Sequence, residues 1–370
     1  MTDALAPTRK RAEFHPLSVS AVRRLTEDSI EVAFAVPEEL AGHYDYLPGQ
    51  YLALRKSFDD RELRRSYSIC AVPTRGEVRV AIKRDLGGEF STWANDSLRP
   101  GDVLDVMSPQ GTFTTEFAPE TTKHFAAIVA GSGITPIMSL ARSALEASPY
   151  TRFSLIYSNR TAQDVMFLEE LADLKDRYPA RFALFHVLTR EHRNSELLSG
   201  RVDEARLGTF LEHLVRPADV DEWFICGPFD LVQLCRDTLE GAGVPRGHVH
   251  FELFTTDRPD RPAGSHGRSA PVDDGAGVHT ITFTLDGRTA SVTTPVHGQE
   301  SILNAALRLR SDVPFACAGG VCGTCRATLV DGTVDMEENY ALEPEELERG
   351  YILTCQSHPT SDKVTVNYDS

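Results

Sequence analysis

The sequence predicts a multidomain chain: an antiparallel β-barrel over 12–118, an α/β domain with a parallel sheet over 119–255, and a small α+β domain over 278–370. Three observations lead to this prediction. Short apolar runs fill the first part, strand-like and helix-like segments alternate in the second, and a stretch rich in Pro, Gly, Asp and Arg, 256–277, is expected to be a linker. A chain of 370 residues has room for two or three domains.

Short strands are expected in the first domain. Apolar and polar residues alternate over 29–34, 51–54 and 77–82, and turn-forming residues separate these runs, as at 47–49 and 100–102. Strands divided by regular turns that contain Gly and Pro are typical of an antiparallel barrel or sandwich. We therefore expect an antiparallel sheet that closes on itself.

The middle domain is expected to alternate strands and helices. An apolar run at 125–130 indicates its first buried strand, and a helix is expected from near Pro136. The alternation then repeats, with a helix over 165–177 and further strands over 153–157, 182–188, 222–226 and 248–253. Such alternation predicts a parallel sheet covered by helices on both faces.

The last domain opens with a predicted hairpin. Strand-like residues 279–283 are followed by Asp286-Gly287, a pair that favours tight two-residue turns. Ser301 is a suitable N-cap for a short helix over 302–309, which has one apolar face. A strand pair beside a short helix predicts an α+β domain.

The charge balance limits the classes of partner. The net charge is −16, from 38 Lys and Arg residues against 54 Asp and Glu residues. Such an acidic chain is not expected to have nucleic acid or an anionic membrane surface as its main partner. The basic N-terminal residues are not followed by an apolar stretch, and no run of 18 apolar residues occurs, so a cytoplasmic location is expected.

Four of the seven cysteines form the strongest motif. Cys317, Cys322 and Cys325 lie within nine residues, and Cys355 follows thirty residues later. The spacing C-x4-C-x2-C…C is the plant-type pattern for a [2Fe–2S] cluster held by four thiolates. The residues between the first three cysteines are small, so backbone N–H groups can approach the sulfurs.

Two other interpretations of these cysteines remain open at this point. They could hold a structural zinc ion, or they could be unrelated buried residues. Zinc ribbons usually contain two separate C-x2-C pairs, and here only Cys322 and Cys325 form one. A disulfide framework is not expected in a chain this long with no sign of secretion.

The segment 278–370 resembles a plant-type ferredoxin domain. The runs at 304–307, 313–317 and 353–356 match the pattern of that family. The resemblance implies a β-grasp fold. It also implies that the metal ligands are Cys317, Cys322, Cys325 and Cys355.

Residues of the first domain suggest a flavin site. Arg65 can bind a phosphate with its forked charge, and Gly88 and Ser91 can supply donors at a helix N-terminus. Tyr67 can stack on a flat ring, and Ser68 can hydrogen-bond near its reactive nitrogen. Alternatively, Arg65 is a surface charge and Tyr67 a core aromatic residue.

Residues after the first strand of the middle domain suggest a nucleotide site. Gly131 and Gly133 would let a pyrophosphate approach the backbone where a helix begins. Thr135 is expected as the N-cap and Pro136 as the first helical residue. The run is not a full G-x-G-x-x-G fingerprint, so its position between a strand and a helix supports the prediction more than the motif itself.

Two further features of the middle domain bear on the nicotinamide cofactor. Cys226-Gly227-Pro228 ends a predicted strand, although a lone cysteine can also be a small buried core residue. Arg160 follows the second strand, where an arginine can accept a 2′-phosphate. We therefore expect NADPH, with NADH less favoured. The alternative for Arg160 is a surface arginine stacked on adenine.

The runs at 65–68 and 88–91 resemble the flavin motifs of the ferredoxin–NADP reductase superfamily. The resemblance implies that FAD is bound rather than FMN, that the C-G-P run lies near the nicotinamide, and that an aromatic residue near 254 lies by the flavin. The catalytic residues implied are Ser68, Cys226 and Glu252. The cofactor-binding residues implied are Arg65, Ser66, Tyr67, Ser68, Lys83, Gly88, Ser91, Gly131, Gly133, Thr135, Pro136, Arg160, Cys226, Gly227, Pro228 and Phe254.

Together these sites predict an NAD(P)H-dependent iron–sulfur flavoprotein reductase. A nicotinamide gives two electrons as a hydride, a cluster of this type takes one, and a flavin can mediate between them. Over nearly its whole length, with matching runs at 46–51, 65–70 and 165–170, the chain resembles the reductase subunits of bacterial phenylacetyl-CoA epoxidases. That resemblance implies a di-iron oxygenase as the electron acceptor, in aerobic catabolism of phenylacetate.

Other functions remain open from the sequence. The same motifs occur in reductases of ketosteroid hydroxylases and aromatic-ring hydroxylases. The chain could also be a redox sensor without sustained turnover, or a flavin enzyme that acts directly on a small molecule. A ferredoxin domain argues against the last of these, because such an enzyme needs no one-electron relay.

Overall fold

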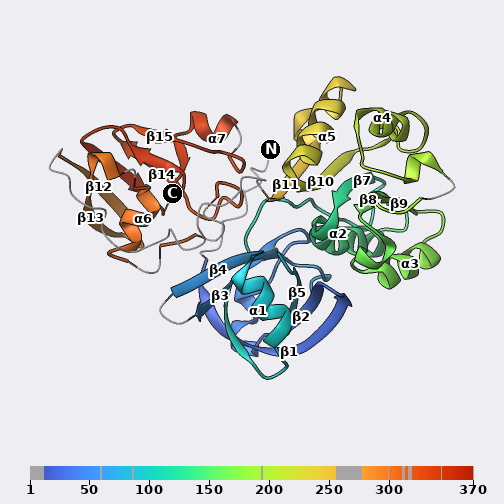
Figure 1. The fold of residues 1–370 in the computed structure, drawn as a ribbon, viewed down its shortest axis with the longest axis horizontal. Helices are drawn as coiled ribbons and strands as arrows, with labels where there is room; N and C mark the ends of the chain where they lie inside the picture. The colour runs from blue at the N-terminus through green and yellow to red at the C-terminus, as the bar shows by residue number, and fades with distance from the viewer. Residues whose placement is uncertain are drawn as a thin grey trace. The chain divides into compact units, whose positions relative to one another are not determined.

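The structure is a computed structural model that describes residues 12–369 except 59–60, 86, 193–194, 256–276, 299, 311–312, 316–318 and 343 (Figure 1). The chain divides into two compact units, one ending at Thr255 and the other beginning at Thr256, and each is described by itself. The predicted linker falls almost wholly outside the described residues, and the boundary predicted at 118/119 stays a prediction. Within the described residues, no helix is both long and apolar enough to span a membrane.

The first unit contains a six-stranded antiparallel sheet in the order β4-β3-β6-β1-β2-β5. Its strands are β1 (Phe14–Thr26), β2 (Ser29–Ala35), β3 (Tyr51–Phe58), β4 (Arg61–Ser68), β5 (Glu77–Lys83) and β6 (Val103–Met107). The two edge strands meet: just after β4, Ile69 pairs with Val80 of β5. The sheet therefore closes into a barrel, as the sequence predicted.

Two short helical segments accompany the barrel, η1 (Glu38–His43) and α1 (Glu89–Ser97). Phe90 of α1 is fully buried in the same apolar cluster as Phe34 and Leu52. The side-chain amide of Asn95 in α1 donates to the Ile82 carbonyl of β5 at 3.3 Å. Apolar packing and this hydrogen bond hold α1 against β5.

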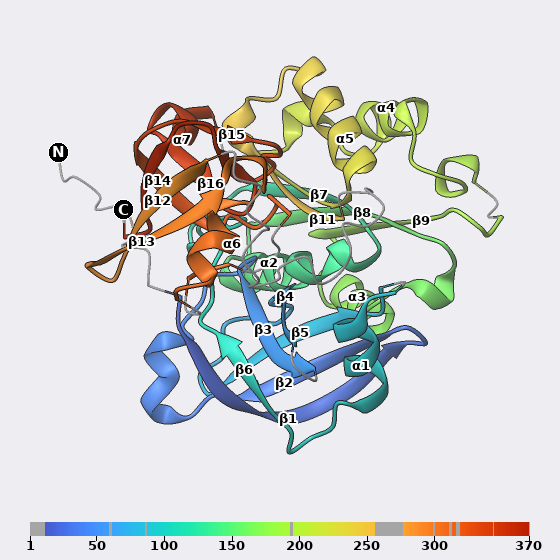
Figure 2. The same cartoon turned by 60° about the vertical axis from the view of Figure 1, so that its left-hand side comes forward.

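The first unit also contains a five-stranded parallel sheet in the order β11-β10-β7-β8-β9. Figure 1 and Figure 2 both show α2 and α3 on one face of this sheet and α4 and α5 on the other. This arrangement confirms the predicted α/β domain. The strands are β7 (His124–Ala130), β8 (Arg152–Asn159), β9 (Phe182–Leu188), β10 (Glu222–Pro228) and β11 (Val249–Thr255). The helices are α2 (Ile134–Ala147), α3 (Leu168–Arg177), α4 (Glu204–His213) and α5 (Phe229–Gly241), with 3-10 turns η2 (Gly131–Gly133), η3 (Ala162–Asp164), η4 (Glu196–Leu198), η5 (Pro217–Asp219) and η6 (Arg246–His248).

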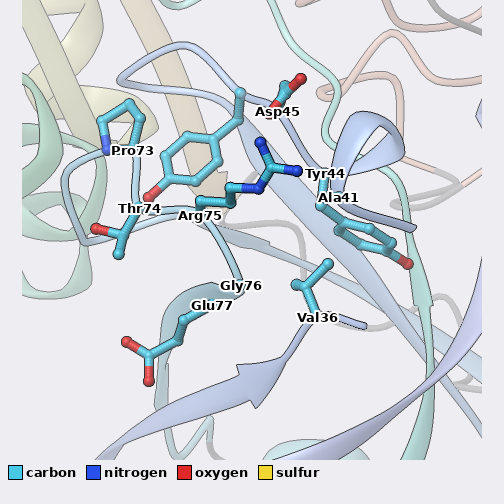
Figure 3. Close-up of a pocket in the computed structure, with 10 residues that line it drawn as sticks. Val36, Ala41, Tyr44, Asp45, Pro73, Thr74, Arg75, Gly76 and Glu77 are labelled. Carbon is cyan, nitrogen blue, oxygen red and sulfur yellow. The ribbon is translucent and has the colours of Figure 1, made fainter. Parts of the chain in front are cut away.

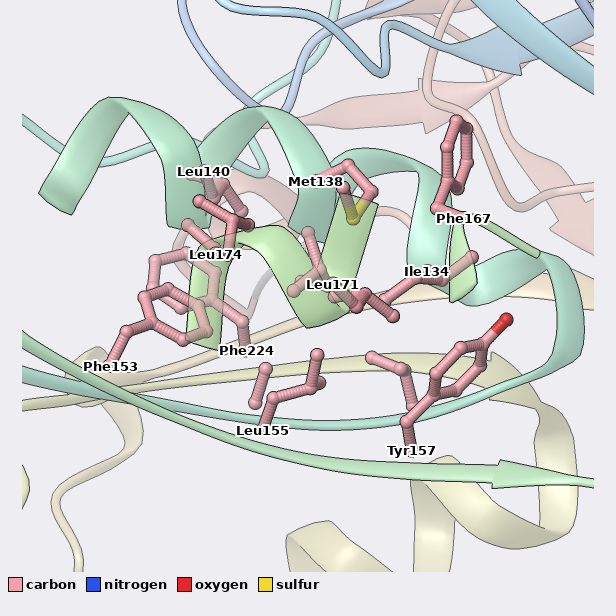
Figure 4. Packing of buried hydrophobic residues seen from close by; sticks show 14 of the residues in the cluster. Ile134, Met138, Leu140, Phe153, Leu155, Tyr157, Phe167, Leu171, Leu174 and Phe224 are labelled. Atoms are coloured by element: carbon pink, nitrogen blue, oxygen red, sulfur yellow. The ribbon is translucent and has the colours of Figure 1, made fainter. Parts of the chain in front are cut away.

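The barrel and the parallel sheet share one apolar core. Figure 4 shows α2 lying across the sheet, with Ile134 and Leu140 among the side chains packed there. Cys70 and Phe113 of the barrel belong to the same buried cluster. The Ser139 hydroxyl of α2 also donates to a barrel carbonyl, that of Ala71, at 2.6 Å. Burial of a common apolar surface therefore joins the two sheets into one unit.

Two predicted helix starts are wrong. The helix expected from 165 begins at Leu168, because Phe167 adopts a left-handed conformation (φ 59°) that an α-helix cannot include. The helix expected from Pro136 begins at Ile134 with Gly133 as its N-cap, because η2 runs directly into it. Thr135 is therefore inside the helix and is not its N-cap.

The second unit is a mixed five-stranded sheet in the order β13-β12-β18-β14-β16, with a separate strand pair and two short helices. This confirms the predicted α+β domain. Its elements are β12 (Val278–Leu285), β13 (Arg288–Pro295), η7 (Val296–Gly298), α6 (Ile302–Leu307), β14 (Arg326–Asp331), β15 (Val334–Met336), α7 (Pro344–Glu348), β16 (Tyr351–Leu353), β17 (Ser357–Pro359) and β18 (Lys363–Asn367).

Local signals in this unit are also confirmed. Asp286 and Gly287 form the turn between β12 and β13, both with positive φ (59° and 67°), as a tight hairpin turn requires. Their N–H groups donate to the Asp369 carboxylate at 2.7 and 2.8 Å. The Ser301 hydroxyl accepts from the Asn304 N–H at 3.3 Å and caps α6. This helix ends at Leu307, two residues earlier than predicted.

We predict that Gly49→Ala destabilises the first unit more than Gly76→Ala does. Both glycines have positive φ (94° and 85°), where a Cβ costs about 1–2 kcal/mol. Only at Gly49 would the added Cβ overlap the Phe113 carbonyl oxygen, which adds about 1–3 kcal/mol. Urea unfolding followed by tryptophan fluorescence measures this, because both tryptophans, Trp93 and Trp223, lie in this unit. Equal urea concentrations at the unfolding midpoints of the two variants would contradict this prediction.

Candidate functional site

The carboxyl ends of β7 and β10 form the centre of the candidate site. The chain leaves β7 toward β8 and β9, then returns to β10 and continues to β11, so the strand order reverses between β7 and β10. Ligands of open α/β sheets bind at such a reversal. Here Gly133 packs against the backbone of Cys226 and Gly227, and a Cβ on Gly133 would overlap the Cys226 carbonyl oxygen. The loop that precedes α2, Gly131–Gly133, thus lies directly against the end of β10.

The three predicted catalytic residues come together at this end of the sheet. Cys226 and Glu252 are register partners on neighbouring strands. The Ser68 hydroxyl, from the barrel, donates to Glu252 Oε2 at 3.2 Å. Burial raises the pKa of the Cys226 thiol well above its usual range, and the Glu252 carboxylate adds to this effect. The thiol is therefore neutral at physiological pH and cannot act there as a thiolate.

The residues predicted to bind flavin lie along the end of β4. Tyr67 lies at a tilt against Phe90, with ring centroids 6.0 Å apart. Arg65 is half-buried, and one of its guanidinium N–H groups donates to the Arg64 carbonyl at 2.7 Å. The Ser66 hydroxyl is buried and has no hydrogen-bond partner among the described residues. A buried polar group of this kind fits a bound molecule that the chain itself does not supply.

The turn before α1 is tightly built. The Ser91 hydroxyl donates to the Gly88 carbonyl at 3.2 Å and accepts from the Asp85 N–H at 3.0 Å. A Cβ on Gly88 would lie 2.6 Å from Ser91 Oγ, so a larger residue would displace this hydroxyl. Gly88 is the N-cap of α1 and provides no side-chain cap, which suits an anion at the first N–H groups. Lys83 lies at the end of β5, and its Nζ is 3.5 Å from Asp28 Oδ2.

A hydrogen bond from the sheet fixes the loop that precedes α2. Gly131 has φ 55°, and its carbonyl accepts from the Tyr157 hydroxyl of β8 at 3.0 Å. The Thr135 hydroxyl donates back to the Ser132 carbonyl at 3.0 Å. Space remains open above Gly131, where an added Cβ would meet nothing within 4 Å. This shape fits the close approach of a pyrophosphate.

Arg160 is exposed just beyond the end of β8. Two acidic side chains near it accept hydrogen bonds from neighbouring residues. The Asp164 carboxylate accepts from the Thr161 N–H and hydroxyl at 3.0 and 2.6 Å, and Glu191 accepts from the Ala162 N–H at 2.7 Å. Partial burial opposes ionisation of Asp164, but the Thr161 hydrogen bonds outweigh it and lower the pKa.

The remaining predicted residues of this unit follow β10 and β11. Pro228 ends β10 and is the N-cap of α5. Pro136 is buried in the first turn of α2. Phe254, two residues after Glu252, is half-buried and packs on the shared apolar core. All these residues therefore lie at the carboxyl edge of the parallel sheet, and their individual roles stay predictions.

The second unit brings the described cysteines of the cluster motif to one loop region. Cys325 and Cys355 are buried and Cys322 is half-buried, whereas Cys317 lies outside the described residues. The Thr354 hydroxyl donates to the Cys325 carbonyl at 2.8 Å, which ties together the two cysteine segments. Thiolates in this spacing are the donor set of a [2Fe–2S] cluster.

Positive φ angles shape the cluster loop. Gly320 and Gly323 have φ 78° and 64°, a conformation that suits glycine. A Cβ on Gly320 would come within 3.0 Å of the Glu338 carbonyl oxygen, so this loop packs against the segment that follows β15. Glycine at positions 320 and 323 therefore suits the backbone path, which fits a loop wrapped closely around a cluster.

Sequence reasoning missed two supporting residues of this region. The Tyr368 hydroxyl donates to Thr354 Oγ1 at 3.0 Å, behind the cysteine loop. Burial raises the pKa of Tyr368, and the nearby sulfurs of Cys325 and Cys355 raise it further. The position of Thr354 beside a cysteine is the only sequence signal for this pair, because Tyr368 reaches the loop only through the fold.

A small surface pocket lies elsewhere, between η1 and the turn before β5 (Figure 3). Among the described residues, none of those predicted to bind a cofactor lines it. Its lining residues are Val36, Ala41, Tyr44, Asp45, Tyr46, Pro73, Thr74, Arg75, Gly76 and Glu77.

Three protein families match successive parts of the chain. The oxidoreductase FAD-binding domain matches residues 16–115, and the oxidoreductase NAD-binding domain matches residues 127–237. The 2Fe-2S iron-sulfur cluster binding domain matches residues 283–360. These matches show FAD, a pyridine nucleotide and a [2Fe–2S] cluster as the cofactors of an oxidoreductase.

Full-length relatives have the same organisation. One subunit of the 1,2-phenylacetyl-CoA epoxidase of Escherichia coli is 42% identical over 96% of this chain and 98% of its own. The ferredoxin reductase component of the Rhodococcus rhodochrous 3-ketosteroid-9-alpha-monooxygenase is 34% identical over 95% of this chain and 96% of its own. The solved structure of phthalate dioxygenase reductase has the same fold, with a TM-score of 0.60 at 23% identity over 96% of this chain and 98% of its own. The chain belongs to the ferredoxin–NADP reductase-type oxidoreductases that carry a C-terminal [2Fe–2S] ferredoxin domain.

Proposed function

We propose that this chain is the reductase component of an oxygenase of the phenylacetyl-CoA epoxidase type, and that it delivers electrons from NADPH to the di-iron oxygenase component in phenylacetate catabolism. The observation that carries this proposal is the 42% identity, over nearly the full length of both chains, to a component of that epoxidase. The order of the three cofactor domains supports it, because oxygenases take electrons one at a time from such relays.

When bound, FAD would accept a hydride from the nicotinamide and release the electrons singly to the [2Fe–2S] cluster. We propose that the end of β4, with Arg65, Ser66 and Tyr67, holds the flavin together with Gly88 and Ser91. The buried Ser66 hydroxyl, which has no partner among the described residues, and the lack of a side-chain cap at the N-terminus of α1 support this assignment. Lys83 and Phe254 complete the predicted flavin environment.

Ser68, Cys226 and Glu252 are proposed to position the nicotinamide. Ser68 is 4% exposed, and its hydroxyl donates to Glu252 at 3.2 Å. Cys226 is fully buried and keeps its proton, so it presents a compact neutral group. Together these residues bring a hydroxyl, a neutral thiol and one carboxylate to the edge of the site.

We propose NADPH rather than NADH as the donor. Arg160 is exposed just beyond the end of β8, where a bound ribose would lie. A guanidinium there favours a 2′-phosphate. A donor from the NADPH pool also agrees with the cytoplasmic location expected from the sequence.

The proposed function predicts that wild-type protein mixed with NADPH and the oxygenase components of the Escherichia coli epoxidase forms epoxide from phenylacetyl-CoA. Cys355→Ser should abolish product formation, because it removes one of the four proposed cluster ligands. The variant should still reduce ferricyanide with NADPH, since that dye can take electrons before the cluster. Product formation with a ketosteroid oxygenase instead of the epoxidase would overturn the assignment of the acceptor.

An anaerobic titration of the wild type with NADPH provides the control for this relay. The flavin and cluster absorption bands should both bleach. Bleaching of the flavin band alone would show that the cluster is not in electronic contact with it.

We predict that Ser68→Ala slows reduction of the flavin by NADPH by about 10²-fold, the effect of losing one positioned hydrogen-bonding group in an active site. Stopped-flow absorbance measures the rate, with flavin content determined separately. Ser143→Ala is the matched control, because the Ser143 hydroxyl is buried in α2 without a hydrogen-bond partner among the described residues. Unchanged rates in the Ser68 variant would exclude it from the site.

We predict that Arg160→Gln lowers kcat/KM for NADPH by about 10- to 100-fold, the loss of hydrogen bonds to a charged group, and leaves kcat/KM for NADH unchanged. Steady-state kinetics with both donors measures this. Arg177→Gln, at the exposed end of α3, removes the same charge and should change neither value. A wild type that prefers NADH would contradict the proposed donor.

A further inference from the structure

Three potential metal ligands that are not among the predicted cofactor residues converge on the barrel. Glu13 immediately precedes β1, His15 lies in it, and His43 is the last residue of η1. Glu13 Oε2 lies 3.7 Å from His15 Nε2 and 3.6 Å from His43 Nδ1. The three ligand atoms all lie within 4.8 Å of one another. Two imidazoles and one carboxylate therefore face a common point.

A neighbouring tyrosine orients the His15 ring. The buried Tyr44 hydroxyl donates to the Val106 carbonyl at 2.7 Å, and Figure 3 shows it directed away from the other residues that line the pocket. Since its proton is committed, the Tyr44 oxygen accepts at 3.3 Å from His15 Nδ1. His15 Nε2, on the other side of the ring, faces Glu13 Oε2 at 3.7 Å, a separation that leaves room for a cation between the two atoms.

The spacing suits a transition-metal ion. In a tetrahedral zinc site with bonds of about 2.0–2.1 Å, ligand atoms are about 3.3 Å apart. The distances from Glu13 Oε2 to the two histidine nitrogens exceed this by only a few tenths of an ångström, whereas the two histidine nitrogens lie within 4.8 Å of each other. A hydrogen bond from His15 Nδ1 to a fixed group is also the outer-shell arrangement that orients metal-bound histidines.

The three ligand residues are not held equally firmly by the surrounding structure. The Glu13 carbonyl accepts from the Ser108 N–H at 2.7 Å, and its own N–H donates to Ser108 Oγ at 3.1 Å, so the backbone of Glu13 is fixed to the strand end after β6. The His15 side chain is 19% exposed, whereas that of His43 is 47% exposed. His43 is therefore the ligand that can move to complete the site.

We propose that Glu13, His15 and His43 bind a divalent transition-metal ion of the zinc class, with water in the remaining position. Imidazole ligands favour such an ion over Mg²⁺ or Ca²⁺, which prefer oxygen ligands. The site is separate from the four-cysteine motif, which lies in the other unit. Binding would link η1 to the start of β1 and so stabilise the barrel.

Titration calorimetry with ZnCl₂ tests this on untagged holoprotein that has first been passed over a chelating resin. The wild type should bind one zinc ion per chain, and the thermal unfolding midpoint should rise with zinc. His43→Gln and Glu13→Gln should each weaken binding at least about tenfold, in line with the loss seen when metal sites are disrupted. An unchanged visible spectrum would show that zinc has not replaced iron in the cluster.

His213→Gln is the matched control. His213 is an exposed histidine paired with one carboxylate, Glu212, at 3.5 Å, and within the described part of the chain it belongs to no group of three potential ligands. This variant should bind zinc like the wild type. Absence of saturable zinc binding in the wild type, or equal affinity in the wild type and in both the His43 and Glu13 variants, would overturn the proposal. Neither result would affect the proposed reductase function, because none of these residues belongs to the cofactor sites.

Discussion

The close packing of Gly133 against the backbone of Cys226 and Gly227 is the contact on which the nucleotide site depends. It brings the start of α2 and the end of β10 so near that only a residue without a Cβ fits. The Ser68–Glu252 hydrogen bond then joins the barrel to the same edge of the sheet. Because the barrel and the sheet also share one apolar core, these distances are held by packing and do not depend on the polar contacts alone.

The local parts of the fold were predictable from the sequence. The cysteine spacing, the Asp286-Gly287 turn and the Ser301 cap are signals read over a few neighbouring residues, and the structure contains each of them where it is described. The helix starts at Ile134 and Leu168 were not predictable in this way. A 3-10 turn precedes one helix and a left-handed Phe167 precedes the other, and neither is signalled by the apolar pattern of the neighbouring residues.

The parts of the sites that the sequence did not predict depend on contacts between distant segments. The Tyr368 support behind the cysteine loop and the meeting of Glu13 with His43 have no local pattern. The remaining described cysteines illustrate the same point. Burial raises the pKa of Cys70, Cys226 and Cys235, so these thiols stay protonated and are poor nucleophiles, a property that counting cysteines cannot show.

The position of β18 has a consequence for how the protein matures. This strand lies in the middle of its sheet, between β12 and β14, although it follows both of them in the chain. The sheet of the second unit therefore cannot close until residues 363–367 have left the ribosome, by which time the first unit has been fully synthesised. Because domains generally fold in the order of synthesis and pairing between distant strands is slow, the second unit should complete its sheet, and with it the setting of the cysteine loop, after the first unit has folded.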